Sequence, residues 1–211
     1  MSTQTTDLGR DSIGKLLFKL ATPAIIAQLV NVLYNIVDRI FIGRLPEGDL
    51  AMAGIGVAFP IIMLISATSA LIGMGGAPLA AIKMGEQDHD GAEKIMSNAL
   101  SMLVILSILL MMSLLIFKEP LLLAFGASSQ TLVYANDYLG IYILGTLFVQ
   151  IAIGMNPFIN TQGFAKIGMM TVMVGAVVNI ILDPIFIFGL NLGVKGAAFA
   201  TITAQFISAI W

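Results

Sequence analysis

Six long apolar stretches dominate this 211-residue sequence, and each is long enough to cross a lipid bilayer as a helix. The hydrocarbon core of a bilayer needs about 20 mostly apolar residues per helical span. Short polar connectors containing Gly, Pro or charged residues separate the stretches, as expected where helices end. We place the spans at about residues 16–43, 50–84, 95–117, 131–160, 168–190 and 195–211. The sequence therefore predicts an all-α transmembrane protein folded as a six-helix bundle.

Composition excludes several other classes of protein. With 58% hydrophobic and 10% charged residues, the chain lacks the polar surface that a water-soluble domain presents. The 10 basic and 12 acidic residues nearly balance, so no strongly basic face for nucleic acid is expected. The absence of Cys and the single His89 exclude disulfides, thiolate metal sites and Cys nucleophiles, and they leave few catalytic groups. We expect a membrane protein that is not an enzyme and that has no cofactor and no nucleic-acid partner.

The polar residues 1–15 are predicted to form a cytoplasmic N-terminal segment ahead of a transmembrane lobe at 16–211. The first span is too long for the apolar region of a signal peptide. Apolar residues at helical spacing suggest a short amphipathic helix near this start, and they are Ile13, Leu16, Leu17 and Leu20. With the N-terminus inside, six basic residues are cytoplasmic and four lie outside, which the positive-inside rule favours. We therefore expect a multi-pass protein of the plasma membrane with a cytoplasmic N-terminus.

An aspartate lies late in the first span, where an ionisable group is expensive. A charged side chain at bilayer depth costs about 2.5 to 3.5 kcal/mol on insertion scales, so such groups mark functional sites. Asp38 follows Asn35, Asn31 and Gln28 at offsets of three and four residues. These offsets predict one polar stripe that faces the bundle or a water-filled cavity.

A second acid lies in the fifth span, where Asn179 and Asp183 are four residues apart on one helical face. Pro184 follows directly and lacks the backbone N–H that would satisfy a carbonyl one turn earlier. Either acid could instead be interfacial, because Asp38 precedes Arg39 and Asp183 lies close to the end of its span. Since each acid has an amide on its own face, we favour a shared buried polar site.

Two further features concern packing. The fourth span contains polar residues along a helix that Gly154 and Pro157 are expected to bend, and they are Tyr138, Tyr142, Gln150, Asn156 and Asn160. The small-residue runs GMGGAP and GVKGAAFA predict places where helices approach closely.

Five segments in order resemble the N-terminal half of a multidrug and toxic compound extrusion (MATE) transporter. They are TPAIIAQLVNVLYNIVDRIFIGRLPEGDLAMAGIG, GMGGAPLAAIKMGEQDHDGAEKIMSNA, NPFINTQGFAK, NIILDPIFIFG and GVKGAAFATITAQ. The resemblance implies twelve helices in two six-helix lobes around a central cavity. It also implies that cationic or lipophilic drugs are exported in exchange for protons or sodium ions.

The resemblance also implies roles for particular residues. The cation site of such proteins falls on Asp38, Asn179, Asp183 and Thr201, and Thr201 rests on the resemblance alone. Its supporting polar network falls on Asn31, Asn35, Tyr138 and Asn156. Asn31 departs from relatives that often carry Gln, which affects the hydrogen bonding of the network. The coupling ion is H⁺ or Na⁺, because the carboxylates can take up a proton and an oxygen-only donor set suits a hard cation.

Rival functions make different demands on the sequence. An intramembrane aspartyl protease has a GxGD context for its second acid, whereas the contexts here are IVDR and ILDP. A flippase for lipids or lipid-linked oligosaccharides, the main alternative, typically lines its cavity with several Arg or Lys, and no cation lies mid-membrane here except Arg39 near the end of its span. Twelve spans need about twice this length, so the lobe requires a second six-helix lobe, either from a missing C-terminal half or from a second copy.

Overall fold

The computed structural model describes residues 12–211, without the side chains of Lys15 and Leu16. Most of the predicted cytoplasmic segment therefore lies outside the described residues, and so does Leu16 of the predicted amphipathic helix. The first helix begins at Ile13, so the helical spacing noted there continues into the long first helix without a break.

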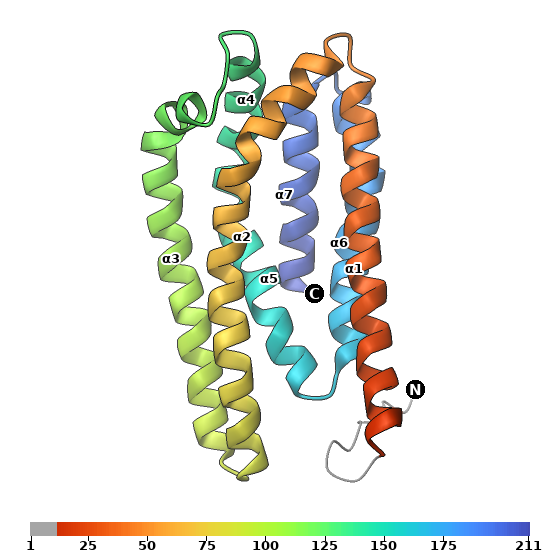
Figure 1. Ribbon diagram of the computed structural model, residues 1–211, viewed down its shortest axis with the longest axis vertical. Helices are drawn as coiled ribbons and strands as arrows, with labels where there is room; N and C mark the ends of the chain where they lie inside the picture. Colours follow the sequence, from red (N-terminus) through yellow and green to blue (C-terminus); the bar gives the residue numbers. More distant parts are fainter. Residues whose placement is uncertain (1–11) are drawn as a thin grey trace.

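Every regular element in the described part of the chain is helical, as predicted (Figure 1). The elements in order are α1 (Ile13–Gly43), α2 (Gly48–Gly85), α3 (His89–Ala124), α4 (Thr131–Leu144), α5 (Thr146–Thr161), α6 (Ala165–Pro184), the π-helical η1 (Ile185–Gly189) and α7 (Val194–Ile210). The α2–α3 and α5–α6 connectors lie at the same end of the bundle as the start of α1, and the α1–α2 and α3–α4 connectors lie at the opposite end (Figure 1).

Four helical segments in the described residues are long and apolar enough to cross a membrane, namely α1, α2, α3 and α6 continued by η1. The α4–α5 pair passes as a fifth span although its two parts are bent by 62°, and the apolar α7 is shorter, at 17 residues. Each predicted span thus contains helix, and α3 extends several residues beyond the predicted 95–117 at both ends.

The break in the fourth predicted span, with its 62° bend, lies at Gly145, whereas we expected a bend at Gly154 and Pro157. A Cβ atom on Gly145 would lie 2.4 Å from the Cγ2 atom of Ile202 in α7. The bend therefore occurs where the chain must pass close to α7, a contact that the sequence of the span does not reveal. Pro157 is accommodated inside α5.

Glycines bring helix backbones into direct contact at two points. A Cβ atom on Gly73 of α2 would lie 2.4 Å from the carbonyl oxygen of Gly154 in α5. A Cβ atom on Gly196 of α7 would lie 2.6 Å from the carbonyl carbon of Phe186 in η1. Both glycines lie in the runs predicted to allow close approach, so that prediction is confirmed at these positions.

The π-helical η1 separates α6 from the turn into α7. The Leu190 N–H donates to the Ile185 carbonyl at 2.8 Å, five residues back, which is the hydrogen-bond pattern of a π-helix. Asn191 and Gly193 both have positive φ, and they turn the chain sharply into α7. Asp183 therefore lies at the junction between a regular helix and an irregular, tightly packed segment.

Candidate functional site

Two carboxylates are buried between α1 and α6. Asp38 of α1 is 8% exposed and Asp183 of α6 is fully buried. The two side chains are close enough to interact electrostatically. The structure thus places both acids inside the lobe, in one shared site, rather than at its outer surface.

Asn179 and Thr201 complete a group of four polar side chains from three helices. The Asn179 Nδ2 atom donates to Asp183 Oδ1 at 3.2 Å, which fixes the amide on the face of α6 that carries the acid. The same nitrogen lies 3.5 Å from Thr201 Oγ1 on α7. Thr201, which only the resemblance had indicated, therefore contacts the residues that the polar pattern had indicated.

Three buried oxygen atoms at this site lack a hydrogen-bond donor among the described residues. They are Asp38 Oδ1, Asn179 Oδ1 and Asp183 Oδ2. Buried polar atoms in folded proteins are nearly always paired, so three unpaired acceptors in one place require an explanation. A proton on a carboxylate or a hard cation bound by carboxylate, amide and hydroxyl oxygens would satisfy them.

Tyrosine side chains surround the carboxylates. Tyr138 and Tyr142 of α4 are buried and stacked, with ring centroids 6.1 Å apart and planes at 17°. Tyr138, which the resemblance places in the supporting network, lies near Asp38. Tyr34 of α1 lies near both acids and was not predicted. Its spacing of four residues from Asp38 was the signal that could have identified it.

Two residues of the predicted network, Asn31 and Asn35, form a separate pair on α1. The Asn35 Nδ2 atom donates to the Asn31 carbonyl at 2.7 Å and to its Oδ1 atom at 3.0 Å. Asn35 is exposed in this lobe, whereas Asp38 is buried. A step of three residues falls about 60° short of a full helical turn, so Asn35 lies on the flank of α1 beside Asp38. Of the predicted stripe, which was expected to face the bundle or a water-filled cavity, Asp38 thus faces the bundle, whereas Asn35 does not.

Asn156 lies far from the carboxylates. Its Nδ2 atom donates to the Gly168 carbonyl at 2.9 Å, and its Oδ1 atom accepts from Asn160 Nδ2 at 3.0 Å. Gly168 precedes Asp183 by 15 residues in the same helix, a separation of roughly 22 Å. In this lobe Asn156 joins α5 to the start of α6, and the structure does not bring it to the predicted cation site.

A second buried polar cluster joins α2 to α5 near the bend. Gln150 is fully buried, its Nε2 atom donates to Thr68 Oγ1 at 3.0 Å, and its Oε1 atom accepts from Ser69 Oγ at 2.9 Å. Because the amide is paired at both ends and no charged group takes part, this cluster stabilises packing rather than forming a binding site.

Comparison with known proteins identifies relatives along nearly the whole chain. A sequence profile of the MatE family matches residues 23–185. The multidrug export protein MepA of Staphylococcus haemolyticus is 32% identical over 200 residues, which cover 95% of this chain and 44% of that protein. MepA of Staphylococcus aureus strain MSSA476 is 26% identical over 202 residues, which cover 96% of this chain and 45% of the relative.

Solved structures give the same result. An outward-facing multidrug resistance MATE family transporter of the MOP superfamily matches with a TM-score of 0.91 at 29% identity, covering 100% of this chain and 46% of that one. A crystal structure of MATE in complex with MaD3S matches with a TM-score of 0.91 at 28% identity, covering 100% and 47%. The chain thus spans about half the length of the relatives that it matches.

Proposed function

This chain belongs to the MATE family and corresponds to an N-terminal half, and on that premise we propose that it is the cation-binding lobe of a secondary antiporter that exports cationic or lipophilic drugs. The observation that carries the proposal is the group of three unpaired buried oxygens on Asp38, Asn179 and Asp183. An inert helical bundle has no reason to keep such a group, because each unpaired polar atom destabilises it.

Ion coupling follows from the electrostatics of two neighbouring buried carboxylates. Removing both charges from water and placing them side by side is unfavourable unless a positive charge joins them. One proton or one sodium ion would relieve the repulsion between Asp38 and Asp183. Ion entry and exit would then alter the packing of α1 against α6, and we propose that this change drives drug release.

The chemistry of the donor set supports either ion. Two carboxylates, the Asn179 amide oxygen and the Thr201 hydroxyl are hard oxygen donors of the kind that bind sodium. A proton needs only the carboxylate pair, with Asn179 already hydrogen-bonded to Asp183. Imposing a proton gradient and a sodium gradient separately on proteoliposomes decides between the two ions.

The polarity of the site favours cation coupling over flippase activity. A phosphate-bearing lipid would need basic side chains, whereas this site presents two acids, an amide and a hydroxyl. Arg39 interacts electrostatically with Asp38, and its guanidinium lies over the ring of Phe59 at 5.8 Å from the centroid, so it is a single basic group beside two acids. The supporting evidence thus points to a cation as the coupling ligand.

The test is gradient-driven drug efflux by the transporter that contains this lobe. We expect Asp38→Asn and Asp183→Asn each to reduce efflux at least tenfold, because either change removes the charge that attracts the ion. Asp137→Asn is the matched control, since Asp137 is a half-exposed acid paired with Lys195 at 3.4 Å outside the site. Unchanged efflux in both site variants, with normal expression and folding, would show that the assignment is wrong.

The remaining parts of the proposal concern the whole transporter. A second six-helix lobe would supply the other wall of the drug cavity. We also propose a plasma-membrane location with the N-terminal end of the bundle in the cytoplasm. Three lysines lie at that end, on the α2–α3 and α5–α6 sides, and they are Lys83, Lys94 and Lys166 (Figure 1). Together with Arg10, Lys15 and Lys19 of the N-terminal region, they give six basic residues inside against four outside, the bias that the positive-inside rule favours.

A further inference from the structure

A pocket that the ion-coupling site does not involve lies at the N-terminal end of the bundle. It has a volume of about 330 Å³ and is formed by the end of α2, the start of α3 and the end of α5. This volume falls at the lower end of the range for small-molecule sites. Asp183 ends α6 at the opposite end of the bundle, so the pocket and the carboxylate pair are separate sites (Figure 1).

The apolar wall of the pocket includes Met84, Met96 and Phe158. Phe158 is 2% exposed and packs in a cluster with Ala77, Ala80 and Ala99. Because Gly76 has no side chain, the ring can lie where a Cβ atom on that residue would be only 2.8 Å away. The aromatic wall is therefore held in place by the fold itself, and the methionines beside it can adapt to different apolar groups.

One acidic side chain dominates the charge of the pocket. Glu93 lines it, is exposed, and makes no hydrogen bond or ion pair with any residue that the structure describes. Ser97 follows one turn later on α3, and Gln162 faces it from the end of α5. His89 is the other ionisable residue of the lining.

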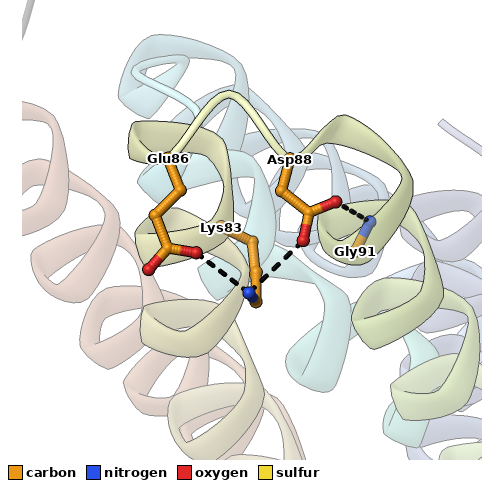
Figure 2. Close-up of polar contacts among 4 residues, drawn as sticks. All are labelled: Lys83, Glu86, Asp88 and Gly91. Carbon is orange, nitrogen blue, oxygen red and sulfur yellow. Dashed lines mark hydrogen bonds and ion pairs between the residues drawn. The ribbon is translucent and has the colours of Figure 1, made fainter.

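The lysine of the adjacent connector does not neutralise Glu93. Lys83 Nζ lies 2.9 Å from Glu86 Oε2 and 3.3 Å from Asp88 Oδ2, so it already has two acidic partners (Figure 2). Asp88 in turn accepts a hydrogen bond from the Gly91 N–H at 2.9 Å, which holds the connector in this arrangement. The connector therefore compensates its own charges and leaves the carboxylate of Glu93 available.

We propose that this pocket binds an amphiphile with a single ammonium headgroup, the ammonium at Glu93 and the apolar body against Phe158 and the two methionines. A carboxylate attracts the positive charge, and the two methionines with the buried Phe158 ring form an apolar wall beside it. Methionine walls tolerate apolar groups of different shape. The ligand is either a lipid with an ammonium headgroup or a soluble amphiphilic cation, because both present the same chemistry.

The absence of Cys from the chain allows a direct binding test on the purified, reconstituted protein. Ser97→Cys places one thiol in the pocket lining, and its labelling rate with a maleimide is measured in phosphatidylglycerol nanodiscs. We expect dodecyltrimethylammonium to slow labelling at least threefold, whereas uncharged dodecyl maltoside has no such effect. Thr161→Cys, on the facing wall, provides a second reporter if the first variant folds poorly.

Charge variants then test the role of Glu93. Glu93→Gln should raise the half-protecting concentration of dodecyltrimethylammonium by about two- to fivefold, the size expected for an exposed ion pair. Asp90→Asn is the matched control, because it removes the same charge from the first turn of the same helix and Asp90 does not line the pocket. It should leave protection unchanged.

Lipid composition identifies the source of the headgroup. If labelling is already slow in phosphatidylethanolamine nanodiscs without added amphiphile, the lipid itself occupies the pocket. If only dodecyltrimethylammonium protects, the ligand is a soluble cation. Equal protection of wild-type and Glu93→Gln protein, or equal protection by dodecyl maltoside, overturns the proposal. The assay needs no ion gradient, so its outcome is independent of the proposed antiport.

Discussion

The contact between Gly196 and η1 makes a sharp prediction about both stability and the cation site. In Gly196→Ala, the new Cβ atom would lie 2.6 Å from the Phe186 carbonyl carbon and oxygen and 2.7 Å from the Ile187 nitrogen. These are backbone atoms and cannot move aside as a side chain can. The difference between 2.6 Å and an ordinary contact of at least 3.4 Å means that α7 and η1 must separate by about 0.8 Å.

Such a separation reaches the site because Thr201 lies on α7 and Asn179 lies on α6, the helix that η1 continues. The Asn179 Nδ2 to Thr201 Oγ1 distance is already 3.5 Å, so a shift of this size takes it to about 4.3 Å, beyond hydrogen-bond range. Overpacking of this kind typically destabilises a protein by about 1–3 kcal/mol. We therefore expect lower stability together with weaker ion coupling.

The assay is unfolding in detergent followed by the helical circular dichroism signal, combined with gradient-driven efflux. Gly75→Ala is the control, because it makes the same substitution inside a helix at a position with no atom within 4 Å of the new Cβ. Alanine is the better helix former, so this control should be neutral or stabilising within this lobe. If Gly196→Ala is as stable as the control and transports normally, the two backbones are not in contact and the reasoning fails.

Two further predictions concern polar groups away from the cation site. Gln150→Leu removes the amide that joins α5 to α2, so Thr68 and Ser69 keep hydrogen bonds only within their own helix. We expect the unfolding free energy to fall by about 1–3 kcal/mol, with little change in efflux per folded molecule. The pKa of Asp88 lies below its usual value because the carboxylate accepts a hydrogen bond from the Gly91 N–H and pairs with Lys83. A carboxyl group whose pKa is lowered by folding stabilises the fold at pH values above its unfolded-state pKa. This stabilisation is lost as the pH falls through the folded-state pKa. The thermal stability difference between wild type and Asp88→Asn, which keeps a capping side chain, should therefore shrink as the pH is lowered towards 3, and a difference independent of pH would contradict this account.

Much of this protein could be predicted because hydropathy and the energetic cost of buried charge are local properties of a sequence. The long apolar runs predicted where helices lie, and α1 and α2 end within a few residues of the predicted bounds. Asp38, Asn179 and Asp183 were identified because polar groups within apolar spans are rare and expensive. The sequence by itself thus determined the fold class and indicated the two acids that the structure buries close together.

Only the tertiary structure decided how these helices are rotated and where they bend. It turns Asp38 inward and leaves Asn35 on the exposed flank, because packing of α1 against α6 selects one face among several polar ones. It also bends the α4–α5 pair at Gly145, where Ile202 approaches from a helix more than fifty residues later in the chain. Contacts between distant segments depend on which surfaces fill the same space, and no local pattern in the sequence records that information.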